Sequence, residues 1–124
     1  MINLNRPETV VILGLEYKII YADNPSDVDI HRRESLWGQI DYWTRTIRIY
    51  DNNRSIEDIW HSLIHEVLHG IASELHIKSL EYKSVDDQSH HDLDILSLAI
   101  TDVLFRNGWI TADKVSDEKL LGKR

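Results

Sequence analysis

The sequence predicts an α+β domain in which a small antiparallel sheet of two hairpins is followed by two helices. Two observations support this fold class. β-branched and aromatic residues are concentrated in two stretches before residue 51, and apolar residues recur at helical spacing after residue 55. The chain of 124 residues fits a single domain, 1–124, with a charged C-terminal tail from about residue 111.

The first hairpin is expected in residues 9–21, TVVILGLEYKIIY. β-branched and aromatic residues favour strands, and Gly14 interrupts them. Two short strands around a turn are therefore predicted.

The second hairpin is expected in residues 37–53, WGQIDYWTRTIRIYDNN, with its turn near Thr44-Arg45. After that turn Ile47 and Ile49 alternate with Thr46, Arg48 and Tyr50. A period of two is typical of a strand that is buried on one face.

The first helix is expected to begin after Ser55. Asp58, three residues on, gives a capping box with Asp in place of the usual Glu. The residues that follow keep the i, i+3, i+4, i+7 spacing of an amphipathic helix. Its apolar stripe contains Ile56, Ile59, Trp60, Leu63, Ile64, Val67, Leu68, Ile71 and Leu75.

The second helix is expected from about Gln88 to Arg106, where Asn107-Gly108 ends it. It is apolar nearly all round, except for one narrow polar stripe. A buried helix with a polar stripe needs a polar surface to face, and the histidine-bearing face of the first helix supplies one. The stripe consists of His90, Asp94, Ser97 and Thr101.

Composition and charge exclude several classes of protein. Because there is no cysteine, neither a disulfide framework nor a thiolate metal site can form, and a metal would be bound by His, Asp or Glu. The formal net charge of −7 argues against general nucleic-acid binding. No stretch has the length of a membrane span and no signal peptide is recognised, so a cytoplasmic protein is expected.

The segment HSLIHEVLHG, residues 61–70, contains the pattern HExxH. Histidines four apart on a helix have neighbouring side chains, so His65 and His69 can point at one ion. Such a pair binds zinc, and Glu66 would act as general base toward the metal-bound water. Both histidines fall opposite the apolar stripe, where a solvated polar face is the alternative to a metal site. His61 shares their line and is interpreted as a cleft-edge or surface histidine.

A catalytic zinc has three protein ligands and one open position, so one more ligand is needed for one Zn²⁺ per chain. The polar stripe of the second helix favours His90. Asp94, one turn on, can accept the free ring N–H of a ligating histidine. His91 lies about 100° away from His90 around the helix. The alternative ligands are His91 and a carboxylate from Asp86, Asp87 or Asp92.

HExxH, followed by a helix with a ligand and an aspartate four residues later, resembles the gluzincin metallopeptidases. In that clan the downstream ligand is a glutamate, whereas here His90 takes its position before Asp94. The surrounding pattern is similar to small phage and prophage proteins of the minigluzincin and ImmA/IrrE types. The similarity covers about residues 9–109 and includes a GxID…IRI hairpin, the LIHEVLHGI segment and the helix end Arg106-Asn107-Gly108-Trp109.

This resemblance implies a zinc-dependent metallopeptidase that hydrolyses a peptide or protein in the cytoplasm of a bacterial or phage-infected cell. In gluzincins the strand before the active helix, here Arg45–Tyr50, forms the cleft rim and pairs with extended substrate. The chemistry also requires a group that stabilises the oxyanion. The residues available for that role are Tyr82, His76, His61 and Tyr50. The aromatic residues that would either line the cleft or pack in the core are Trp37, Tyr42, Trp43 and Trp109.

Two other functions fit the same residues. A non-catalytic phage-type zinc protein would bind a protein partner through an edge strand or its acidic surface. A structural zinc site would be closed by a fourth protein ligand such as His91 or Asp92. The intact Glu66 favours an enzyme, because a structural site needs no base beside its ligands, whereas the small size of the chain favours a binding protein.

Overall fold

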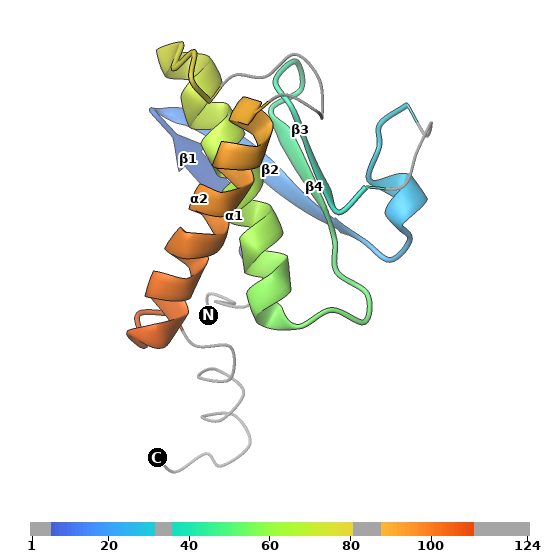
Figure 1. Ribbon diagram of the computed structural model, residues 1–124. Helices are drawn as coiled ribbons and strands as arrows, with labels where there is room; N and C mark the ends of the chain where they lie inside the picture. The colour runs from blue at the N-terminus through green and yellow to red at the C-terminus, as the bar shows by residue number, and fades with distance from the viewer. Residues whose placement is uncertain (1–5, 32–35, 81–87, 111–124) are drawn as a thin grey trace.

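The computed structural model describes residues 6–31, 36–80 and 88–110, and it has a four-stranded sheet and two long helices (Figure 1). The α+β class expected from the sequence is confirmed, as are both hairpins and both helices. The elements in chain order are β1 (Thr9–Ile12), β2 (Leu15–Ala22), the short 3-10 helix η1 (Pro25–Asp27), β3 (Gly38–Asp41), β4 (Thr46–Tyr50), α1 (Ile56–Leu75) and α2 (Gln88–Arg106).

The two hairpins join into one sheet with the strand order β1-β2-β4-β3. β1 pairs with β2, and β3 with β4, in antiparallel fashion, whereas the central pair of β2 and β4 is parallel. The prediction that the strand at Arg45–Tyr50 forms the cleft rim is wrong. β4 lies between β2 and β3 with both of its edges paired, so the strand at the sheet edge beside it is β3.

The turn of the first hairpin consists of Leu13 and Gly14, with φ values of 49° and 86°. Positive φ at both positions is the arrangement of a type I′ turn, whose twist matches that of the flanking strands. The second hairpin turns over residues 42–45, as expected, and Asp41 stabilises it. The Asp41 carboxylate accepts hydrogen bonds from the Trp43 N–H (3.0 Å) and the Thr44 hydroxyl (2.7 Å).

The core lies between the sheet and α1, which packs on β1, β3 and β4. Alternate residues of the strands point into it, while Ile20 and Val11 are exposed on the other face. α1 approaches β1 closely, because a Cβ atom at Gly70 would lie 2.9 Å from Cδ1 of Ile12. The buried cluster is Ile12, Tyr17, Ile19, Ile47, Ile49, Ile59 and Leu63.

Both helices begin or end at the residues that the sequence predicts. The Ser55 side chain accepts a hydrogen bond from the Asp58 N–H (3.1 Å) at the start of α1. α2 ends at Arg106, and Gly108 follows with a φ of 70°. No helix in the described ranges is both long and apolar enough to cross a membrane.

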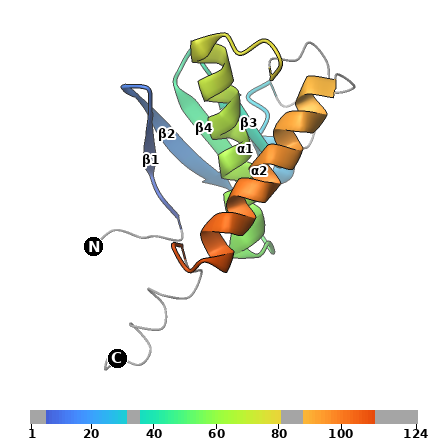
Figure 2. The ribbon, with the colours of Figure 1, turned by 60° about the vertical axis from the view of Figure 1, so that its left-hand side comes forward.

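α2 packs across α1 (Figure 2). Its polar stripe faces that helix, since Asp94 contacts His65. Ser97 and Thr101 of this stripe are buried, and their hydroxyls donate to the carbonyls of Asp94 and Ser97 (2.7 Å each). The helix is not buried on all sides, however. Its outer face leaves large apolar side chains about half exposed, among them Ile95, Leu98 and Val103.

Ile47→Ala should lower the free energy of unfolding by about 3 kcal/mol, because Ile47 is fully buried between the sheet and α1. Ile20→Ala is the matched control, since Ile20 lies on the open face of the neighbouring strand β2; it should cost less than about 1 kcal/mol. Urea unfolding in a metal chelator measures both. Equal losses would contradict the placement of the core.

Candidate metal centre

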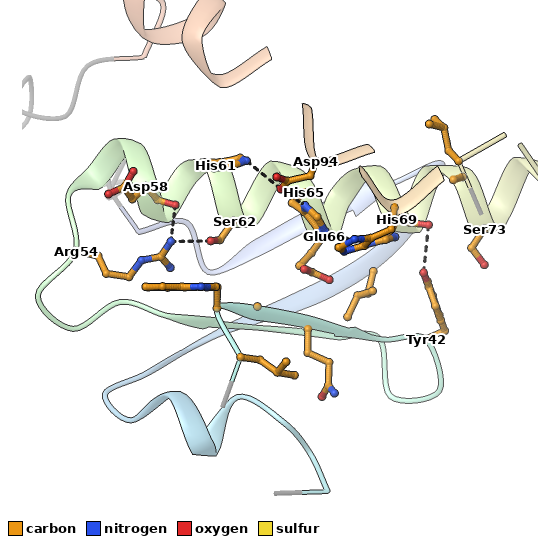
Figure 3. A pocket seen from close by; sticks show the side chains of 18 of the residues that line it. Tyr42, Arg54, Asp58, His61, Ser62, His65, Glu66, His69, Ser73 and Asp94 are labelled. Atoms are coloured by element: carbon orange, nitrogen blue, oxygen red, sulfur yellow. Dashed lines mark hydrogen bonds and ion pairs between the residues drawn. The ribbon is translucent and has the colours of Figure 1, made fainter. Parts of the chain in front are cut away.

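A cleft with a volume of about 1220 Å³ lies between α1 and the edge strand β3, and α2 borders it at His90 and Asp94. In Figure 3, Arg54 lies toward one end of the cleft and Tyr42 toward the other, with Glu66 and His69 between them. The Tyr42 hydroxyl donates to the backbone carbonyl of His69 (3.2 Å), which ties the hairpin turn to the middle of α1.

Three histidines come together on one wall of this cleft. His65 and His69, one turn apart on α1, have Nε2 atoms 3.0 Å from each other. His90 of α2 completes the group, with its ring centroid 5.4 Å from that of His65 and 6.0 Å from that of His69. One nitrogen from each ring lies within 4.8 Å of the others, so the three lie close enough to bind a metal ion.

The donor set fits zinc. Imidazole nitrogens at 2.0–2.1 Å from a tetrahedral zinc are about 3.4 Å apart, so small movements of the three rings would suffice. Metal binding needs the neutral imidazole. Burial lowers the pKa of His65, and burial together with the neighbouring His65 and His90 lowers the pKa of His69 to about 3. Both rings on α1 are therefore neutral at physiological pH.

Asp94 of α2 orients the ring of His65. Its Oδ1 lies 2.9 Å from His65 Nδ1, so the carboxylate accepts the Nδ1 proton and the opposite nitrogen, Nε2, faces His69. Asp94, which the sequence predicted to accept the ring N–H of a metal-binding histidine, thus contacts His65. A carboxylate in this position fixes the tautomer and strengthens the imidazole as a metal ligand.

Glu66 lies on the side of α1 that faces β3. Its residue is 7% exposed, and burial raises the pKa of its carboxyl to about 8, opposed in part by a hydrogen bond from the backbone N–H of Ile40. A Cβ atom at Gly38 would lie 3.2 Å from Glu66 Oε2, so glycine leaves room for the carboxyl there. A carboxyl with a pKa close to neutral is suited to accept and return a proton.

The other predicted site residues are spread more widely. His61 lines the cleft, and its Nε2 lies 3.3 Å from Asp94 Oδ1, although not in a hydrogen-bonding direction. His91 and Asp92 are exposed and stand outside the histidine group. His76 is exposed at the C-terminal end of α1. Tyr82, Asp86 and Asp87 lie outside the described residues.

The four aromatic residues considered for the cleft lie outside the buried core cluster. Trp37 and Tyr42 line the cleft, whereas Trp43, at the hairpin turn, is 95% exposed and Trp109 is 70% exposed. Tyr50 packs its ring against Trp37, with centroids 5.8 Å apart.

Arg54, which was not predicted from the sequence, lines the cleft immediately before the cap of α1. Its guanidinium lies over the ring of Trp37, 4.4 Å from the centroid. A signal was present in the sequence. A cation beside a helix N-terminus is unfavourable for the helix dipole, so an arginine at that position suggests another role.

Comparison of the chain with protein-family models, with curated proteins and with solved structures finds no match. The resemblance to gluzincins therefore stays a prediction.

His90→Ala should weaken zinc binding severely, and His65→Ala or His69→Ala should abolish it, because each removes one of the three converging imidazoles. Asp94→Asn should bind zinc about 10–100-fold more weakly, since His65 loses its carboxylate partner. Competition with a chelating dye measures the affinities.

The control is His91→Ala, which removes the exposed histidine next to His90 and should leave zinc binding nearly unchanged. If His91→Ala were as damaging as His90→Ala, the assignment of the ligands on α2 would be wrong.

Proposed function

We propose that the protein is a zinc-dependent metallopeptidase whose ion is held by His65, His69 and His90. The observation that supports this most is that a buried carboxyl, Glu66, opens onto the same cleft as the three converging histidines. A metal site that served only to stabilise the fold would need no such carboxyl. Burying one without an ion-pair partner lowers stability, and that cost is understandable where the group takes part in chemistry.

A zinc ion bound there would act as a Lewis acid that polarises a peptide carbonyl and lowers the pKa of a water molecule. Glu66 accepts the proton of the attacking water and delivers it to the departing amine. Its position between α1 and β3 limits its contact with solvent, and the Ile40 N–H holds it in place. Asp94 keeps the His65 ring in the orientation that the ion requires.

The volume of the cleft also favours a substrate. A chain of this size has little room for pockets, yet the cleft of about 1220 Å³ is larger than a single zinc site would require. It reaches from Arg54 to Ser73 along α1, which is long enough for several residues of an extended peptide.

A second function, binding of a protein partner without catalysis, is favoured by the position of β3. This strand lies at the edge of the described sheet and borders the cleft, so it offers backbone groups to another chain. That function would give no reason for the buried carboxyl of Glu66. A test for peptide hydrolysis distinguishes the binding protein from the peptidase.

Glu66→Gln keeps the size and hydrogen-bonding capacity of the side chain but cannot accept the proton. It should retain zinc and the fold, but its rate of peptide hydrolysis should be at least about 100-fold lower than that of the wild type. Cleavage of a peptide library by the zinc-loaded protein, followed by mass spectrometry, provides the measurement.

Glu74→Gln, an exposed position on the same helix, is the control and should cleave as the wild type does. Loss of zinc in Glu66→Gln would make Glu66 a ligand, and an undiminished rate would rule it out as the base.

A further inference from the structure

Arg54 is held rigidly at one end of the cleft. Its Nη1 donates to the Tyr50 carbonyl (2.7 Å), and its Nη2 donates to the Asp58 carbonyl (3.0 Å) and to Ser62 Oγ (2.8 Å). Trp37 covers one face of the guanidinium. The side chain is partly buried, and these contacts fix the plane of its N–H groups relative to α1 and β4.

This guanidinium has no carboxylate partner among the described residues. By contrast, Arg6 pairs with Asp51, and Arg106 pairs with Glu57 through two hydrogen bonds. Asp58 offers Arg54 its backbone carbonyl, while its carboxylate acts only at longer range. A guanidinium has five N–H groups. Three are used, so Nε–H and one Nη1–H remain for another acceptor.

A partly buried arginine normally has an acidic partner, because removing a cation from water is unfavourable unless it is paired. Among the described residues, no other lysine or arginine lines the cleft. The acidic residues that line it include Asp58, Glu66 and Asp94. The missing partner is therefore expected to come from what enters the cleft. A carboxylate suits either of these free N–H groups, because a charge-assisted hydrogen bond is stronger than a neutral one.

We propose that Arg54 and Trp37 form a subsite for a carboxylate of the substrate, either an acidic side chain or the C-terminal carboxylate of a peptide. This inference rests on the proposed peptidase function, because it assigns part of the specificity of that cleft. Ser62, which holds Arg54, lies one helical turn before Glu66, or about 6 Å along the axis. An extended peptide advances about 3.3 Å per residue, so the carboxylate lies about two residues from the bond that is cleaved.

A purely structural role would also use the three existing contacts, since they join the end of β4 to the start of α1. It would not make peptide binding depend on a carboxylate. The experiment therefore measures binding of defined peptides rather than stability.

The full chain carrying Glu66→Gln is loaded with zinc, labelled with ¹⁵N and titrated with short Ala/Ser peptides that it cannot cleave. One peptide has a single Glu and an amidated C-terminus, the second is neutral with a free C-terminus, and the third is neutral and amidated. The first, the second or both should bind about tenfold more tightly than the third, as expected for a charge-assisted hydrogen bond. The peptide whose affinity exceeds that of the neutral, amidated peptide identifies the source of the carboxylate.

Arg54→Gln in the same background should abolish that advantage, whereas Arg48→Gln, on β4 and outside the cleft lining, should keep it. If Arg54→Gln fails to fold, the Nε–H resonance of the unaltered Arg54 still reports. It should shift with a carboxylate peptide and stay in place with the neutral amide.

Equal affinities for all three peptides, or an advantage that survives Arg54→Gln, would overturn the proposal. The readout does not depend on hydrolysis. A protein that cleaves no peptide but shows the Arg54-dependent preference would refute the peptidase function and keep the subsite. A protein that cleaves peptides but shows no such preference would keep the peptidase function and refute the subsite.

Discussion

The contact between Asp94 and His65 joins the two helices at the point where the site is built. It places a carboxylate from α2 on the outer nitrogen of a histidine from α1, and this directs the inner nitrogen toward His69. The same register of the helices carries His90 to the group, one turn before Asp94. Further along α2, Ser97 and Thr101 satisfy their hydroxyls with carbonyls of their own helix. At this part of the interface the polar contacts are therefore those of the histidines with one another and with Asp94.

Glu66 and Asp94 lie on opposite sides of the histidine line and have different environments. Glu66 is buried against β3, where burial raises its pKa to about 8, while the side chain of Asp94 is half exposed and paired with His65. A carboxyl with a raised pKa can take and return a proton near neutrality, and a paired carboxylate holds an imidazole in one tautomer. The fold thus gives the two acids different environments, through burial for Glu66 and through pairing with His65 for Asp94.

Local signals in the sequence predict the helices and most of the candidate site. Ser55 and the Asn107-Gly108 pair set helix ends through contacts within a few residues, and the structure agrees. The polar stripe of α2 predicted which histidine faces α1, because the rotation of a helix follows from its own residues. The parallel pairing of β2 with β4 could not be predicted in this way. It joins strands from separate hairpins, and it is what moves β4 into the interior of the sheet. The position of Arg54 in the cleft could not be predicted for a similar reason, since Trp37, which covers its guanidinium, comes from the start of the second hairpin.

A crystal structure of the zinc-loaded chain tests the central claim most directly. We expect one zinc ion bound by His65, His69 and His90, with a solvent ligand in the fourth position on the side of Glu66. A zinc ion closed by a fourth protein ligand would make the site structural. A zinc ion bound elsewhere, with the three histidines left unliganded, would contradict the metal centre itself.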